Sequence, residues 1–416
     1  MKLWSRVDND WQWLLAICLM SASTMLVFLN YPAVLPLLQE EWNLSSAQAG
    51  MIYASYQVGY IFFVVLLSTL TDYFNTRYIF AGSAIWAGVA NLLFTFYAHG
   101  LTSALLFRTL AGCGLAGTYM PGLHLVSERF SRERRGRAVG FYVASFTTGA
   151  TLSLLITGLV TAMAGWRTAF LITSFGPFIG GGTAFLFLKT EDREKGQRPK
   201  LAEIRRGVLG NSPALLMILG YVAHMWELFG MRGWIAAFLT AKLIESSREL
   251  TNATGFGASL SALVMIMGAI STASAGYLSD RFGRLRTITT LMVASGLCTS
   301  LIGWAKPLPF AAIMGLSLAS SFLATADSSV LSTGITELVA PEVLGTAQAL
   351  QSFLGFAAAS LSPLVFGYIL DWTNPALGSG TVRVASHWGW AFSSLGLGAV
   401  GGLLVMSRLK RYGGDL

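Results

Sequence analysis

The sequence predicts an all-α integral membrane protein with 12 transmembrane helices arranged as two pseudo-symmetric six-helix bundles. Three observations carry this prediction. The chain of 416 residues is 54% hydrophobic and 12% charged, whereas an ordinary soluble domain has about 25% charged residues. Apolar runs recur at lengths near the roughly 20 residues that cross a bilayer as a helix. Several features also recur half a chain length apart, which indicates an internal repeat.

Twelve apolar runs are long enough to span the membrane. The narrowest separation is between the ninth and tenth runs, where Lys306–Pro309 must form a tight turn. We place the spans at 11–38, 47–70, 78–98, 101–126, 137–162, 167–188, 213–240, 254–279, 287–305, 308–335, 345–371 and 388–407.

The distribution of positive charge predicts the orientation. Most of the 28 Lys and Arg residues lie in alternate loops, with dense clusters in 129–137 and 189–206. The positive-inside rule places these loops, and both termini, in the cytoplasm. Lys2 and Arg6 precede an apolar run too long for a signal peptide, so we expect the first span to be retained. These features predict a multi-pass protein of the plasma (inner) membrane, embedded in the lipid bilayer.

The two halves of the chain repeat each other. Asp72 and Asp280 each close a span, the second and the eighth, and Gly136 and Gly345 each open one, the fifth and the eleventh. A charged segment separates the halves. We therefore predict an N-terminal bundle over 1–188, a cytoplasmic linker over 189–212 and a C-terminal bundle over 213–416.

One loop carries a recognisable motif. The run Gly276-Tyr-Leu-Ser-Asp280-Arg281-Phe-Gly283-Arg284 resembles the cytoplasmic loop motif of the major facilitator superfamily. In the first half, Asp72 and Arg77 remain of the corresponding copy. We expect Gly276 to admit a neighbouring helix, and Arg281 and Arg284 to offset Asp280 in a latch at the membrane rim. The predicted gate consists of Asp72, Arg77, Gly276, Asp280, Arg281, Gly283 and Arg284.

Arg108 is the only charged residue in 101–120. A cation at such a depth costs roughly 2.5–3.5 kcal/mol on insertion scales, so it needs a polar cavity or partners. Two interpretations are open: contact with an anion or a carboxylate, or a packing cation bonded to backbone carbonyls. With Gly112 and Gly114, it resembles the family's fourth-helix motif, whose arginine is associated with proton coupling. We attribute these glycines to close helix packing, not to dinucleotide binding.

The second half contributes the other ionisable residues within spans: Glu227, Arg232, Asp327 and His224. Burial disfavours the charged form of a carboxylate, so Glu227 could exchange a proton near neutral pH. It could alternatively pair with Arg232, although five helical residues turn these side chains about 140° apart. Asp327 could pair with a rim arginine or line a cavity. Uncharged candidates for lining a cavity are Asn30, Tyr31, Tyr56, Gln57, Trp226, Gln348 and Gln351, where Asn30–Pro32 interrupts the first span.

The resemblance implies alternating-access transport around a site near the membrane midplane. We expect symport of protons with a small organic, anionic solute, in which Arg108 attracts the anion and Glu227 carries the proton. Alternatives are a drug-like efflux pump of the same fold and a solute sensor that does not transport. No catalytic triad, metal cluster or pair of catalytic carboxylates occurs at usable spacing, and no basic aromatic face suits nucleic acid. We therefore expect a monomer that is not an enzyme and that uses no cofactor and no metal.

Overall fold

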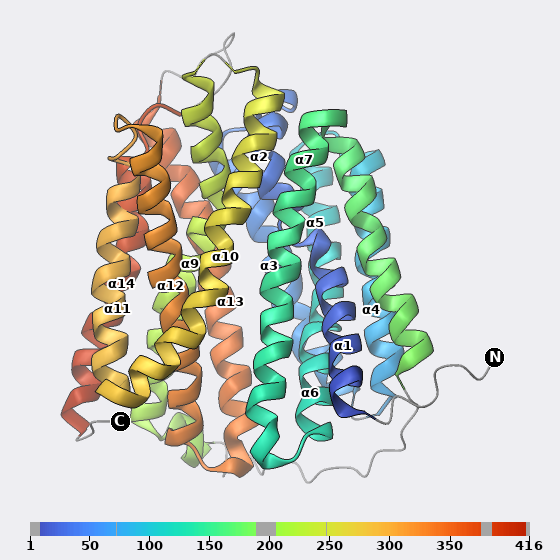
Figure 1. Ribbon diagram of the computed structural model, residues 1–416, viewed down its shortest axis with the longest axis vertical. Helices are drawn as coiled ribbons and strands as arrows, with labels where there is room; N and C mark the ends of the chain where they lie inside the picture. Colours follow the sequence, from blue (N-terminus) through green and yellow to red (C-terminus); the bar gives the residue numbers. More distant parts are fainter. Residues whose placement is uncertain (1–8, 72, 189–204, 247, 376–384, 413–416) are drawn as a thin grey trace. The chain divides into compact units, whose positions relative to one another are not determined.

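The computed structural model describes residues 9–71, 73–188, 205–246, 248–375 and 385–412. Within these ranges every regular element is helical (Figure 1). The chain forms two compact units: Met1–Leu44, Ser55–Lys195 and Ser246–Ala262 make up the first, and Ser45–Ala54, Gly196–Glu245 and Leu263–Leu416 the second. The bundle boundaries at 188 and 213 remain a prediction, and most of the predicted linker lies outside the described residues.

The first unit is built around the long helix α7, which packs against α1, α2, α4 and α6. Gly165 lies within α7 with a φ of 80° and a ψ of 164°, so α7 consists of two helical stretches, 132–164 and 166–187. The helices are α1 (Asp10–Thr24), α2 (Asn30–Glu41), most of α3 (Ser46–Leu70), α4 (Thr76–Tyr97), α5 (Leu101–Ala116), α6 (Tyr119–Arg129) and α7 (Arg132–Phe187), with a 3₁₀ turn at Met25–Val27.

In the second unit, α9 packs against α11, α12, α13 and α14, and α11 lies beside α14 (Figure 1). The bounds are α9 (Ser212–Ile244), most of α10 (Leu250–Phe282), α11 (Arg284–Ile302), α12 (Phe310–Leu338), α13 (Pro341–Thr373) and α14 (Gly389–Leu409), with short turns at Arg205–Leu209 and Lys410–Tyr412. The turn predicted at Lys306–Pro309 is confirmed, because α11 ends at Ile302 and α12 begins at Phe310.

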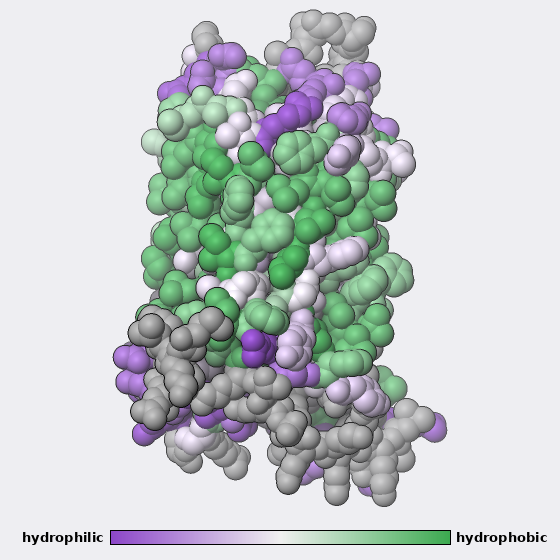
Figure 2. Space-filling model, turned by 90° about the vertical axis from the view of Figure 1, so that its right-hand side faces the viewer, coloured by the Kyte–Doolittle hydropathy of each residue, from purple (hydrophilic) through white to green (hydrophobic). Residues whose placement is uncertain are grey.

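Each of the twelve predicted spans is helical over most of its length. Within the described residues, 9 helices are long and apolar enough to cross a membrane. One of these contains both stretches of α7 and thus two predicted spans. The second predicted span corresponds to α3, and the fourth to α5 and α6 together. Exposed apolar side chains such as Phe62, Leu159 and Leu186 suit contact with lipid, and Figure 2 shows hydrophobic residues across the middle of one face and hydrophilic residues toward both ends.

The first span is broken, and the break lies earlier than expected. The α-helix ends at Thr24, a 3₁₀ turn covers Met25–Val27, and α2 starts at Asn30. The sequence suggested Asn30–Pro32 as the interruption, but these residues form the first turn of α2. Proline fits there because the first four N–H groups of a helix have no partner within the helix.

Glycines bring α3 and α5 into backbone contact within the first unit. A Cβ added to Gly112 would lie 1.9 Å from the Tyr56 carbonyl oxygen, and one added to Gly59 would lie 2.1 Å from that of Thr109. A Cβ on Gly114 would lie 2.6 Å from that of Ala87 on α4. These approaches confirm the interpretation of Gly112 and Gly114 as packing residues.

We predict that Gly112→Ala destabilises the protein, because the added Cβ would clash with the Tyr56 carbonyl oxygen and neither the α3 nor the α5 backbone can easily shift. Overpacking of this kind costs about 1–3 kcal/mol, so the apparent Tm in detergent should fall by several degrees. The matched control is Gly182→Ala in α7, where an added Cβ meets nothing described within 4 Å. This control should keep or slightly raise the Tm, because alanine favours helix. Equal behaviour of the two variants would contradict the close α3–α5 contact.

Candidate functional site

The Arg108 side chain is buried in the first unit, with 1% of its surface exposed. Its Nη1 donates to the carbonyl oxygen of Val27 at 3.1 Å and to Asn30 Oδ1 at 3.0 Å, and its Nη2 donates to the carbonyl oxygen of Phe28 at 3.1 Å. Val27 and Phe28 lie at the break in the first span, where carbonyls lose their helical partners. The guanidinium therefore satisfies backbone groups that would otherwise be exposed at membrane depth.

Hydroxyl and aromatic groups complete this arrangement. Ser153 Oγ on α7 donates to the carbonyl oxygen of Leu26 at 2.6 Å and accepts from the N–H of Leu29 at 3.2 Å. The guanidinium carbon of Arg108 lies 4.5 Å from the ring centre of Tyr56 and 5.7 Å from that of Tyr31. Cation–π contacts of this kind add stabilisation where the cation is desolvated.

Asn30 links Arg108 to a wider buried network. Its Nδ2 donates to Asn91 Oδ1 at 2.9 Å and to Thr173 Oγ1 at 3.3 Å. Asn91 in turn donates to Ser174 Oγ at 2.8 Å. The structure thus brings Arg108, Asn30, Tyr31 and Tyr56 together, as the sequence could only suggest. We did not predict a role for Asn91, although an asparagine inside an apolar span indicates a buried polar contact.

Glu227 on α9 lies in a second buried polar cluster, in the second unit. Its side chain accepts from Thr299 Oγ1 at 2.6 Å and from Ser295 Oγ at 3.1 Å, both on α11. Thr299 Oγ1 lies 2.6 Å from Ser320 Oγ on α12, and either hydroxyl can be the donor. Because hydroxyls both donate and accept, this chain can bond either protonation state of the carboxyl group.

His224 and Asp327 lie next to this cluster, and Glu227 is within electrostatic range of both. His224 Nδ1 lies 2.7 Å from Asp327 Oδ1, with both side chains almost fully buried. The contact lacks the alignment of a regular hydrogen bond. Among the described residues Asp327 therefore has a histidine partner on α9 and no arginine partner, so the first of the two alternatives for it, a rim arginine, is wrong.

Arg232 does not pair with Glu227, so this alternative expectation is also wrong for the described residues. Its guanidinium carbon lies 5.5 Å from the Phe229 ring centre, and it is within electrostatic range of Tyr53 and Tyr221. Tyr53 reaches α9 at Gly233, where an added Cβ would lie 2.9 Å from its ring. Among the described residues, no carboxylate oxygen lies within 4 Å of this half-buried cation.

The remaining cavity candidates are spread over three helices. The Trp226 indole on α9 donates to the Ser394 carbonyl oxygen at 3.0 Å, so it packs against α14. On α13, Gln348 is exposed and Gln351 is buried. On α3, Gln57 is buried with 1% of its surface exposed.

The loop motif is organised around Arg284. Its Nε and Nη2 donate to the two Glu337 carboxylate oxygens at 2.5 and 2.6 Å, whereas Asp280 Oδ1 lies 3.7 Å away. Gly283 has a φ of 87°, a conformation that favours glycine at this turn between α10 and α11. We did not predict Glu337, which lies at the end of α12.

Other gate predictions have mixed outcomes. A Cβ added to Gly276 would meet nothing described within 4 Å, so the expected close helix approach is absent. The Arg281 guanidinium lies 5.4 Å from the Phe282 ring centre, and that of Arg77 lies 4.5 Å from the Phe185 ring centre. Asp72 lies outside the described residues. The latch itself remains a prediction.

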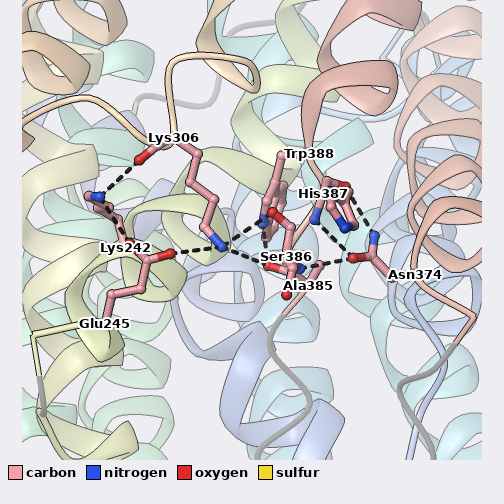
Figure 3. A network of polar contacts seen from close by, with 8 residues as sticks. All are labelled: Lys242, Glu245, Lys306, Asn374, Ala385, Ser386, His387 and Trp388. Carbon is pink, nitrogen blue, oxygen red and sulfur yellow. Dashed lines mark hydrogen bonds and ion pairs between the residues drawn. The ribbon is translucent and has the colours of Figure 1, made fainter.

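A polar network joins the loop ends of the second unit on its predicted outer side (Figure 3). Glu245 binds two lysines: Lys242 Nζ at 2.9 Å and Lys306 Nζ at 3.0 Å. Lys306 Nζ also donates to the carbonyl oxygens of Ala385 and Ser386. Asn374 Oδ1 accepts from the N–H groups of Ser386 and His387, both at 2.9 Å. Partial burial opposes ionisation of Glu245, but the hydrogen bonds and charges of both lysines keep its pKa below the ordinary value.

Comparison with known proteins identifies the family. The profile of the Major Facilitator Superfamily matches residues 14–352. The chain belongs to the major facilitator superfamily. It is thus a membrane transporter and not an enzyme, and the predicted fold of twelve spans in two pseudo-symmetric bundles is confirmed.

Curated relatives within the superfamily share about a quarter of their residues with this chain. A probable sulfoacetate transporter of Cupriavidus necator is 24% identical over 380 residues, covering 86% of each chain. A hexuronate transporter of Bacillus subtilis is 23% identical and covers 83% of this chain and 84% of that protein. A probable chloroplastic anion transporter of Arabidopsis thaliana is 26% identical, covering 86% of this chain and 73% of that protein.

A solved superfamily structure shares the fold. It is a bacterial homologue of the human lysosomal transporter Spinster, in an inward-facing and unoccupied conformation. The TM-score is 0.79 at 15% identity, with 97% of each chain covered. This similarity concerns the arrangement of helices only.

We predict that Arg108→Lys destabilises the protein, because an ammonium cannot reproduce the planar fork that binds Val27, Phe28 and Asn30. Loss of a charge-assisted bond and exposure of a buried carbonyl should lower the unfolding free energy by about 1–3 kcal/mol. The apparent Tm in detergent measures this loss, and Arg248→Lys at an exposed arginine is the control. A variant with the original Tm but no anion binding would instead make Arg108 a solute contact.

We also predict that the Glu245 network loses its stabilising effect in acid. A lowered pKa in the folded protein means that ionised Glu245 contributes stability above its unfolded pKa, and that this stability is lost as the pH falls through the folded value. Glu245→Gln should therefore lower the apparent Tm at about pH 7, with a difference that vanishes toward about pH 3. The exposed Glu40→Gln is the control. A difference that persists in acid would contradict the charge-based account.

Proposed function

We propose that this chain transports a small organic anion by alternating access and that proton movement drives this transport. Support for the substrate class comes from the relatives, whose names specify sulfoacetate, hexuronate, L-galactonate or anions in general. Each of these proteins aligns over more than four fifths of this chain. A drug-like efflux pump and a sensor without transport activity are the alternatives that the experiment below separates.

The surroundings of Arg232 are the structural observation that supports an anionic substrate. A guanidinium at this depth in α9 is costly unless something offsets its charge. Among the described residues it has the aromatic partner Phe229 but no carboxylate within 4 Å. A carboxylate or sulfonate on the solute would provide the missing anion in a bidentate geometry. We therefore assign Arg232 to anion contact and Arg108 to maintaining the broken first span.

We assign the proton to Glu227. When His224 is charged, it offsets Asp327 at 2.7 Å, so Glu227 determines the net charge of the cluster. Its partners Ser295 and Thr299 are neutral hydroxyls that can bond either form of the carboxyl group. Proton uptake thus needs no new partner. It would change the electrostatic potential at Arg232, which lies five residues further along α9, and so couple the proton to the anion.

We propose bundles over 1–188 and 213–416 that rock about a site near the membrane midplane. Both termini would lie in the cytoplasm of a cell with the protein in its plasma (inner) membrane, and the transporter would act as a monomer. The rim residues Asp280, Arg281 and Arg284 would form the latch.

The test is transport in proteoliposomes with an imposed pH gradient, using sulfoacetate, glucuronate and L-galactonate as probes. Glu227→Gln should abolish gradient-driven accumulation but preserve exchange of solute across the membrane, because the proton site is lost and the anion site remains. Arg232→Gln should weaken binding of the transported anion roughly 10–100-fold, as expected for loss of a charge-assisted contact.

Glu40→Gln and Arg248→Gln change the same residue types at exposed positions and should leave transport unchanged. Continued accumulation by Glu227→Gln would overturn the proton assignment. Failure of the wild-type protein to move any organic anion, with transport of cationic dyes instead, would favour efflux. Binding without transport would favour the sensor.

A further inference from the structure

Gln57 is a buried amide whose two polar atoms both lack a hydrogen-bond partner among the described residues. It is the twelfth residue of α3, a helix of 25 residues, and thus lies near its middle. Only 1% of its surface is exposed, and neither Nε2 nor Oε1 has a hydrogen-bond partner among the described residues. A buried amide atom without a partner costs about 1–3 kcal/mol. Both Nε2 and Oε1 of Gln57 carry that cost.

Many hydroxyl groups within the described spans bond to their own helix, although a few, such as those of Thr157, Thr161 and Ser317, have no described partner. Thr109 Oγ1 donates to the Leu105 carbonyl oxygen at 2.8 Å, and Thr95 Oγ1 to that of Asn91 at 2.8 Å. Such bonds to the preceding turn make a hydroxyl inexpensive in a span. Gln57 differs from these hydroxyl residues because it has two polar atoms to satisfy and both lack a described partner.

Its position on α3 favours contact with solute. Tyr53 precedes Gln57 by four residues and Tyr60 follows by three, so the three side chains share one helix face. Tyr56, the residue before Gln57 on α3, lies under the Arg108 guanidinium. The side of α3 that touches α5 is occupied by Tyr56 and Gly59. The amide therefore lies on a polar, aromatic face beside the Arg108 site and not in the α3–α5 contact.

The chemistry of an amide restricts what can satisfy it. The Nε2 group donates and Oε1 accepts. Carboxylates and sulfonates only accept, so an anion without hydroxyl groups would leave Oε1 unpaired. A hydroxyl can do both, and two neighbouring hydroxyls can accept from Nε2 and donate to Oε1 at once.

We propose that Gln57 is a specificity residue that binds hydroxyl groups of the solute, so that hydroxylated organic acids are preferred over acids whose polar groups only accept. This inference rests on the proposed transport of organic anions and narrows its substrate class. Sites built to bond a substrate hydroxyl discriminate strongly, because the analogue without it leaves buried groups unpaired.

The experiment compares Gln57→Met with the wild-type protein, because methionine has a similar shape and no hydrogen-bonding group. Binding and uptake are measured for two hydroxylated probes, gluconate and glucuronate, and two acceptor-only probes, sulfoacetate and succinate. The wild-type protein should prefer the hydroxylated pair. Gln57→Met should weaken binding of that pair about 5–150-fold and affect the acceptor-only pair much less, because those probes bond only Nε2 and leave Oε1 unpaired. Gln12→Met, at an exposed glutamine on α1, is the matched control.

Stability gives a second, independent readout. Without solute, Gln57→Met removes two unpaired polar atoms, so its apparent Tm should equal or exceed that of the wild-type protein. Gln57→Glu, which keeps the shape but only accepts as an anion, should weaken binding of all four probes. A lower Tm for Gln57→Met with an unchanged preference among probes would make Gln57 a structural residue and overturn the inference. If the wild-type protein binds none of the probes, the proposed function itself fails.

Discussion

The break in the first transmembrane span depends on one side chain. Where the helix stops after Thr24, carbonyl groups lose the partners that a membrane helix normally provides from within. Arg108 supplies two of the missing bonds and Ser153 a third. The same guanidinium positions Asn30, through which α4 and α7 join the network. A cation that is costly in a bilayer is thus retained because it replaces still more costly unpaired backbone.

The two units treat buried charge in different ways. In the first, the Arg108 guanidinium is held by backbone carbonyls, the Asn30 amide oxygen and two tyrosine rings. In the second, Glu227 is bound by hydroxyls while His224 and Asp327 lie against each other. A carboxyl group held by neutral donors can change its charge without changing its partners. This difference explains why a fixed role suits Arg108 and a proton-exchanging role suits Glu227.

The spans were predictable because a bilayer imposes both their length and their helical backbone, and a run of roughly 20 apolar residues records both. The partners of the charged residues were not predictable from the sequence. The break at Met25–Leu29 contains neither glycine nor proline. These residues therefore did not indicate a break, or that their carbonyls would bind Arg108. His224 and Asp327 lie in different spans, and their contact depends on how α9 and α12 are rotated about their axes. Ser295, Thr299 and Ser320 resemble the many hydroxyl residues that bond only their own helix.

The broken span also has a mechanical consequence. A continuous helix resists bending through a ladder of backbone bonds, whereas α1 and α2 are connected across a short segment whose carbonyls are held by side chains. Arg108 and Ser153 together set the stiffness of this joint, and a change of the Arg108 rotamer would release the Val27 and Phe28 carbonyls together. The first span can therefore move as two rigid helical segments, α1 and α2, about a hinge that the Arg108 hydrogen bonds hold in one conformation.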